Sequence, residues 1–323
     1  MSRKLIRKYN SNVIDVLLAN DPTQMTIKDR IRLTTSCKDT EEIPKVNNAG
    51  QIVTENALKI QIMHNGVKIL ADSYYGELIT PIIKALKGHH EPQEEKVFNY
   101  LLQRLRKNNP TMIELGSHWA YYSLWFKNSF PGGFNLCCEP DPHNLEMGKE
   151  NAKLNNCNNI TFLQALAGFR DQESTRFSLD SNPNESVMLP IRSVDSLSHE
   201  YGIKYLDLLH FDVQGAELET LHGASTMINS KQLRFVVIST HHYLFSRDPL
   251  THQKCEKFIL EHGGHIIASH TIQQSYSGDG LIVASFSERD KNFIVDISAN
   301  TGSSMFRPYE EDLNILLQYY SRK

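Results

Sequence analysis

The residues most able to do chemistry are acids, histidines and one glycine that each follow or end a run of apolar residues. They are Glu114, Gly116, Glu139, Asp212, His241 and His242. A carboxylate in such a place can accept hydrogen bonds from a bound nucleoside, and a carboxylate or histidine can take a proton from a reacting hydroxyl. If the apolar runs are parallel strands, these side chains meet at the carboxyl edge of one sheet, where ligands of such sheets bind.

The first two strand ends predict a nucleoside cofactor. Gly116 stands alone before a helical pattern, and one glycine cannot form the multi-glycine turn that binds a diphosphate. Glu139 follows Glu114 by about 25 residues, a spacing that suits an acid on ribose hydroxyls. The predicted cofactor site is completed by Ser117, Gln164 and Ala165. In the alternative interpretation, Gly116 is only a turn and Glu139 is an acid favoured by a helix dipole.

The fourth and fifth strand ends predict the reacting group. His241 or His242 could act as a general base, because an unperturbed imidazole titrates near neutrality. Asp212 together with these histidines could instead hold a divalent cation. Since neighbouring strand residues point to opposite faces, we expect one of the two histidines to take part. Alternatively, Asp212 caps the helix that begins near Ala216 and the histidines are structural.

The elements that position these residues begin at Glu94. A helical pattern, EEKVFNYLLQRLRK, leads into a series of apolar runs that alternate with amphipathic segments. This alternation predicts an α/β fold with a Rossmann-like, seven-stranded, mostly parallel sheet covered by helices on both faces. The last two runs, HIIASHTI and GLIVASF, have no clear helix between them. We therefore expect the last strand to be antiparallel, in a hairpin at one edge.

Residues 1–92 lack this alternation and are predicted to form a small N-terminal α+β accessory region before a catalytic domain over residues 93–323. Within it, KIQIMHNGVKIL places Asn65 and Gly66 between two apolar runs. This predicts a β-hairpin with a type I′ turn, which needs a positive φ at both central residues. The preceding segment, CKDTEEIPKVNNAGQIVTEN, is polar and rich in turn residues, so it is predicted to be a loop or a pair of short elements.

Composition excludes several classes of function. The formal net charge of -3 gives no electrostatic reason to expect binding to nucleic acid. The sequence has neither a secretory signal at its N-terminus nor a run of the roughly 18 apolar residues that a membrane span needs. The five cysteines are scattered without metal-binding spacing. We expect a cytoplasmic protein with reduced thiols.

Several segments also resemble the FkbM family of S-adenosylmethionine-dependent methyltransferases. These are MIELGSHWAYYSLWF, LCCEPDPHNLEMGKENAKLNN, SVDSL and, most specifically, LLHFDVQGAELETLHGA. The resemblance implies a class I methyltransferase sheet, S-adenosylmethionine bound along Glu114, Gly116 and Glu139, and O-methylation of sugars or glycosides. It also places segments similar to His89–Glu91 close to the cofactor; in the alternative interpretation these residues form an exposed polar turn before a helix. The sequence departs from the family pattern where Glu114 replaces an aspartate and Ala120, beside Trp119, replaces a second glycine.

The leading hypothesis is therefore an O-methyltransferase that acts on a sugar hydroxyl of a glycan or glycosylated metabolite. The accessory region would shape the acceptor site or a homodimer contact. One alternative keeps the cofactor but changes the acceptor to a non-sugar small molecule or a lipid. Another is a non-catalytic binding protein on the same scaffold, which the altered glycine loop suggests.

Overall fold

A seven-stranded sheet forms the centre of the molecule. The computed structural model describes residues 13–106 and 108–321. Within them the strand order of this sheet is β12-β13-β11-β10-β4-β5-β6. The strands are Thr111–Leu115 (β4), Phe134–Cys138 (β5), Ile160–Leu163 (β6), Leu206–Phe211 (β10), Leu233–Thr240 (β11), His265–His270 (β12) and Gly280–Ser285 (β13). β13 pairs antiparallel with both of its neighbours, and the remaining pairs are parallel.

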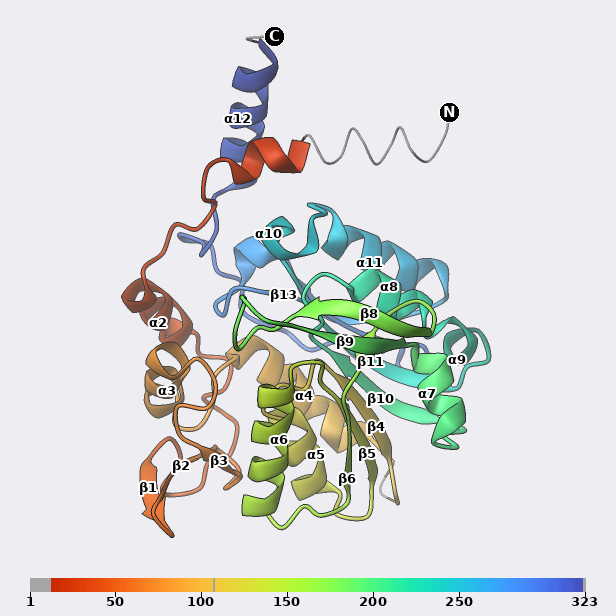
Figure 1. Cartoon of the computed structure of the whole chain (residues 1–323). Coiled ribbons are helices and arrows are strands. Elements are labelled where there is room, and N and C mark those ends of the chain that lie inside the picture. Colours follow the sequence, from red (N-terminus) through yellow and green to blue (C-terminus); the bar gives the residue numbers. More distant parts are fainter. Residues whose placement is uncertain (1–12, 107, 322–323) are drawn as a thin grey trace.

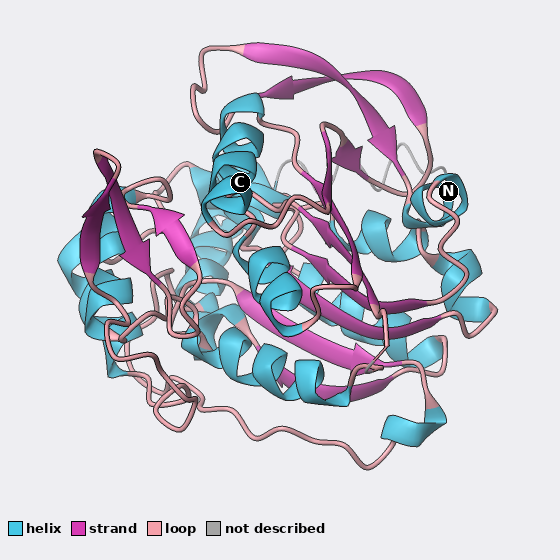
Figure 2. Cartoon of the chain, turned by 90° about the horizontal axis from the view of Figure 1, so that it is seen from below, coloured by secondary structure: helices cyan, strands magenta, loops and turns pink. Residues whose placement is uncertain are grey.

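Helices cover both faces of this sheet (Figures 1 and 2). One face packs against Pro92–Arg104 (α4), Tyr121–Ser129 (α5) and Pro142–Leu154 (α6). The other packs against Val194–Glu200 (α7), Glu217–His222 (α8), Ser225–Asn229 (α9) and Thr251–Glu261 (α11). Successive strand residues alternate between the two cores, as Leu208 and Leu209 do. Both faces need apolar side chains, so the strands appear in the sequence as continuous apolar runs.

The predicted α/β class and the reversed last strand are both confirmed. The chain between β12 and β13 is short and contains one 3-10 turn, Ile272–Gln274 (η1). A parallel return would need a crossover of roughly a dozen residues or more, so the short connection makes β13 antiparallel. A second 3-10 turn, Glu288–Asp290 (η2), follows β13.

A small second sheet lies between β6 and α7 in the chain. Its strands are Leu166–Ala167 (β7), Gln172–Ser178 (β8) and Ser186–Arg192 (β9), in the order β7-β9-β8. The strand β8 reads QESTRFS and is largely exposed, so it lacks the apolar run by which the buried strands were recognised.

The accessory region is α+β, as predicted, and residues 1–12 of it lie outside the described residues. It contains Ile27–Ser36 (α2), Ile52–Glu55 (β1), Leu58–Ile62 (β2), Lys68–Leu70 (β3) and Gly76–Ala85 (α3). The three strands form one antiparallel sheet. The boundary between residues 92 and 93 stays a prediction.

The hairpin of β2 and β3 is confirmed, but its predicted type I′ turn is wrong. Gly66 has a φ of +85°, whereas Asn65 is not among the residues with positive φ. The Asn65 side chain instead accepts a hydrogen bond from the backbone N–H of Val67. Positive φ at two consecutive residues occurs between β1 and β2, at Asn56 and Ala57. Alanine disfavours that conformation, so the residue types at this turn do not indicate it.

The C-terminal part of the chain returns to the start of the described region. Helix α12 (Tyr309–Ser321) lies beside the helical turn of residues 13–18, and both project from the body of the molecule (Figure 1). Ile14 and Leu17 pack with Tyr243 of the short helix Tyr243–Ser246 (α10). None of the described helices combines the length and apolar character that crossing a membrane requires.

Candidate active site

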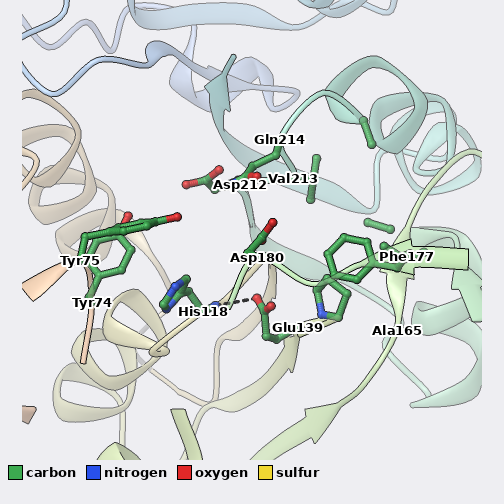
Figure 3. A pocket seen from close by; sticks show the side chains of 15 residues that line it. Tyr74, Tyr75, His118, Glu139, Ala165, Phe177, Asp180, Asp212, Val213 and Gln214 are labelled. Carbon is green, nitrogen blue, oxygen red and sulfur yellow. Dashed lines mark hydrogen bonds between the residues drawn. The ribbon is translucent and has the colours of Figure 1, made fainter. Parts of the chain in front are cut away.

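Two cavities open at the carboxyl edge of the parallel strands. The smaller has a volume of about 190 Å³, and Gly116, Glu139 and Asp212 line it after β4, β5 and β10. Figure 3 shows Asp212 and Glu139 on its walls, with Phe177 of β8 near one end and Tyr74 and Tyr75 near the other. Three neighbouring strand ends therefore converge on one space, as the strand order requires.

The loop after β4 is shaped by residues in the left-handed region. Gly116 has a φ of +72°, and a Cβ atom added there would lie 1.8 Å from the backbone oxygen of Asp212. His118 and Ala120 also have positive φ, +42° and +62°. Ala120 thus adopts the conformation that the second glycine of the motif would take without strain. Trp119 lines neither cavity; its ring stacks on Tyr74 at 4.8 Å.

Glu139 is the best-held acceptor in the smaller cavity. Its Oε2 accepts a hydrogen bond from the backbone N–H of His118 at 2.9 Å, drawn in Figure 3, and its Oε1 accepts one from Asp141 at 2.9 Å. Burial raises the pKa of Glu139 to about 8, although both backbone donors favour its charged form. Each carboxylate oxygen has a second lone pair, so the side chain can accept two further hydrogen bonds.

The predicted cofactor residues divide into two groups. Gly116, Glu139 and Ala165 line the smaller cavity, whereas Glu114, Ser117 and Gln164 line neither cavity.

These three residues make other contacts. Oε2 of Glu114 accepts a hydrogen bond from the backbone N–H of Ser123 at 3.0 Å, and burial raises the pKa of this carboxyl to about 7. The Gln164 side chain donates to the backbone oxygen of Pro140 at 3.1 Å. The side chain of Ser117 is buried, and its backbone N–H donates to Cys138. Glu114 supports helix α5 rather than facing a ligand.

The larger cavity has a volume of about 540 Å³ and shares several residues with the smaller one. Asp212 lines both, together with Tyr74, Tyr75, Asp180 and Gln214. His241 lines only the larger cavity, and so do His90 and Glu91. His89, which the resemblance also placed near the cofactor, lines neither. Asp212 therefore stands where the two spaces adjoin.

His241 lies among three carboxylates. Its Nε2 is 3.0 Å from Oδ1 of Asp212 and 3.7 Å from Oδ1 of Asp279. Its Nδ1 is 2.6 Å from Oε1 of Glu217. Burial would lower the pKa of His241, but the Asp279 and Asp212 carboxylates outweigh burial and raise this pKa well above its ordinary value. The neighbouring carboxylates therefore favour the protonated form of His241, unlike the unperturbed imidazole that the sequence suggested.

His242 does not join this group. It is the N-cap residue of α10, where its Nδ1 accepts a hydrogen bond from the backbone N–H of Leu244 at 3.2 Å. Its ring stacks on Phe306 with centroids 4.1 Å apart. Of the two histidines, His241 lines the larger cavity, whereas the His242 side chain caps α10 and packs on Phe306.

Asp279 is a site residue that the sequence analysis missed. It lines the larger cavity just before β13, and Gly280 pairs with Thr240 at the end of β11. Burial raises the pKa of Asp279 to about 7, and the His241 charge opposes that rise. The predicted reversal of β13 could have indicated this residue, because the start of an antiparallel strand lies at the same edge of the sheet as the ends of its parallel neighbours.

The predicted metal ligands Asp212, His241 and His242 do not form one cluster. Asp212 and His241 form an ion pair, but His242 is not with them. In the described part of the chain, the potential ligands that converge closely are His64, His89 and Glu95, which line neither cavity. The rings of His64 and His89 are stacked 4.1 Å apart at an interplanar angle of 16°. An ion shared by near-parallel rings would lie outside the plane of at least one of them.

The fold and the site define a class of protein. A sheet in which only the last strand is reversed, with a glycine loop, an acid after the second strand and an acid after the fourth, is that of a class I methyltransferase. The profile of the methyltransferase FkbM domain matches residues 87–266, more than half of the chain. The chain belongs to the FkbM family and is a methyltransferase.

Solved structures of similar fold belong to methyltransferases as well. The METTL16 methyltransferase domain has 15% identity and a TM-score of 0.43, with 71% of this chain and 87% of that chain covered. Magnesium protoporphyrin IX methyltransferase (ChlM) from Synechocystis PCC 6803, with bound SAM, has 11% identity and a TM-score of 0.39, with 60% and 78% covered. At these identities the similarity concerns the fold alone. No curated protein matches the chain in a sequence comparison.

The close approach of Gly116 to Asp212 predicts a large cost for any side chain at Gly116. We expect Gly116→Ala to lower the free energy of unfolding by more than about 4 kcal/mol, or to prevent folding, because the Cβ atom meets backbone. Gly202→Ala is the matched control. Gly202 has a φ of +65° with no atom within 4 Å, so only left-handed strain of about 1 kcal/mol applies there. Urea unfolding measures both, and equal losses would contradict the account.

Proposed function

We propose that this chain is an S-adenosylmethionine-dependent O-methyltransferase that acts on a sugar hydroxyl of a glycan or glycosylated metabolite. The observation that carries the proposal is Asp212, which lines both cavities beside His241. A cofactor in the smaller cavity and an acceptor in the larger one would therefore meet at a carboxylate. The predicted cytoplasmic location, homodimer and divalent cation stay predictions.

The smaller cavity fits the chemistry of the cofactor. Glu139 offers two free lone pairs to vicinal hydroxyls, which is what a ribose requires. Apolar side chains of Ala165, Leu166 and Phe177 line the same space and can pack on a nucleobase. The buried Nδ1 of His118 has no hydrogen-bond partner in the described part of the chain and is a further polar atom in the wall. S-adenosylmethionine, when bound, supplies a methyl group on a sulfonium.

The residues at the junction would handle the proton of the acceptor. An attacking hydroxyl must be aligned and must lose its proton to a nearby base. The carboxylates around His241 favour its protonated form, so we expect it to hold these carboxylates in place rather than accept that proton. Asp279 faces the larger cavity with a pKa near neutrality, where a general base works best. Asp212 is the second candidate, and His241 lowers its pKa against the effect of burial.

The sugar acceptor is supported by the wall chemistry of the larger cavity. Tyr74 and Tyr75 present aromatic surface, and Asp180 and Gln214 add hydrogen-bonding groups. Aromatic rings with polar tips suit a ligand that has both C–H faces and hydroxyls. Family membership supports methyl transfer, and the acceptor assignment rests on this wall and on the sequence resemblance.

A pH-dependent affinity for S-adenosylhomocysteine tests the role of Glu139. The ribose hydroxyls donate to the carboxylate, so binding favours the charged form of a group whose free pKa is about 8. Affinity should rise with pH and level off above about 8, and proton release should accompany binding below it. Titration calorimetry in buffers of different ionisation enthalpy measures both.

Glu139→Gln is the matched variant, because it keeps the shape of the side chain and removes its titration. We expect affinity to fall at least about tenfold, since hydrogen bonds to a charged group are lost. The difference in proton release between wild type and variant isolates Glu139 from the ligand's own amino group. Unchanged affinity and proton release in a folded variant would remove Glu139 from the cofactor site.

Turnover of Asp279→Asn and Asp212→Asn tests the base. Replacement of whichever carboxylate is the base should slow methyl transfer to a panel of glycosides about 100-fold or more, since a positioned base contributes on that order. Affinity of Asp279→Asn for S-adenosylhomocysteine should change little. Asp171→Asn is the control, because Asp171 lines neither cavity and pairs with Arg192 at 3.3 Å. Labelled methyl groups followed by mass spectrometry give the rates, and wild-type turnover in both site variants would refute this role.

A further inference from the structure

Much of the larger cavity is built from outside the family domain. The matched domain spans residues 87–266. Helices α2 and α3 of the accessory region contribute Arg30, Leu78, Ile79 and Ile82, and the chain after the domain contributes Asp279, Met305 and Phe306. The part of the site that would contact an acceptor thus lies largely outside the matched domain, and its chemistry bears on the kind of acceptor.

One part of this wall is apolar. Leu78, Ile79 and Ile82 lie on α3 at the i, i+1 and i+4 positions, and each is less than a tenth exposed. Met305 and Phe306 are buried to a similar degree and line the same space. Apolar surface of this kind favours a ligand that removes it from water.

The other part of the wall is acidic. Carboxylates of Glu91, Asp180, Asp212 and Asp279 line the cavity. The cations among the lining residues are those of Arg30, His90 and His241, and the two histidines already contact carboxylates. Arg30 also feels the charge of Asp279, which opposes the effect of burial on the Arg30 pKa. Four carboxylates face three cations, so an acceptor with a phosphate or carboxylate finds no excess of positive charge here, whereas an uncharged polyol can donate hydrogen bonds to the carboxylates.

We infer that the acceptor is an uncharged glycoside with an apolar aglycone, whose sugar lies at Asp212, His241 and Asp279 and whose apolar part lies on the wall of α3. This deepens the proposed function and rests on it for the methyl transfer, although the binding itself does not depend on turnover. Each methylene that leaves water favours binding about fourfold, so three buried methylenes correspond to about 60-fold. Ordering of the chain reduces this gain.

Pairs of octyl and methyl glycosides test the inference. We would use the β-D-glucosides, β-D-galactosides and β-D-mannosides, below the micelle concentration of the octyl compounds and with saturating S-adenosylhomocysteine. Titration calorimetry should give an octyl member that binds at least about tenfold more tightly than its methyl partner in one or more pairs. Octyl β-D-glucuronide, which is anionic, should bind more weakly than octyl β-D-glucoside. Equal affinities within all three pairs, or preference for the glucuronide, would overturn the inference.

Two variants locate the apolar site. Ile79→Asn should remove most of the octyl advantage, and thermal unfolding checks that it folds. Leu244→Ser does the same at a partly buried lining residue that packs against Met305 and Phe306, so its effect on folding is smaller. Leu218→Ser is its matched control, since Leu218 is also partly buried and lines neither cavity. An octyl advantage that both leucine variants retain, or that both lose, would place the chain elsewhere and contradict the inference.

The outcomes separate this inference from the proposed function. Failure to bind S-adenosylhomocysteine at all would contradict the proposed function, whatever the glycosides do. Cofactor binding without an octyl advantage leaves the proposed function standing and overturns the inference. An octyl advantage without transfer of a labelled methyl group supports the inference about binding and contradicts the function.

Discussion

The contact between two strand ends, at Gly116 and Asp212, constrains the whole site. The backbone after β4 passes so close to Asp212 that no Cβ atom fits between them. This approach fixes the loop of residues 116–120, and through its backbone N–H at His118 the loop holds the Glu139 carboxylate. It also fixes Asp212 where the two cavities adjoin. The cofactor space and the acceptor space are therefore set by one backbone contact.

Charge compensation is the second constraint. Several ionisable groups are buried near the junction, and an isolated buried charge would be costly. The His241 imidazolium contacts the carboxylates of Asp212, Glu217 and Asp279. Its positive charge therefore compensates part of their negative charge. Within this cluster, burial and the repulsion of neighbouring carboxylates raise the pKa of Asp279 to about 7. A carboxylate with a pKa near neutrality can accept the proton of the acceptor hydroxyl and then release it to solvent.

The sheet and its strand ends could be predicted because local sequence encodes them. Strands buried on both faces read as apolar runs, and the residues that end them, such as Glu139 and Asp212, are found at once. The glycine loop and the acid after the second strand are a local pattern too.

What the sequence did not reveal depends on tertiary contacts or strand direction. Tyr74 and Tyr75 come to the site from the accessory region, and nothing local in their sequence indicates where that region packs. Asp279 was not predicted because candidate residues were sought at the ends of strands, whereas Asp279 precedes β13. The predicted reversal of β13 implied that this residue lies at the same edge of the sheet. The roles of His241 and His242 differ through their partners, a set of carboxylates for one and Phe306 for the other. The type I′ turn at Asn65 and Gly66 was predicted wrongly because asparagine and glycine permit a positive φ but do not require it.

A crystal structure of the chain with S-adenosylhomocysteine tests the central claim most directly. The account predicts both ribose hydroxyls within about 3 Å of the Glu139 carboxylate oxygens, with the sulfur directed toward Asp212. A ligand bound away from Glu139, or a sulfur separated from Asp212 by the protein, would contradict it.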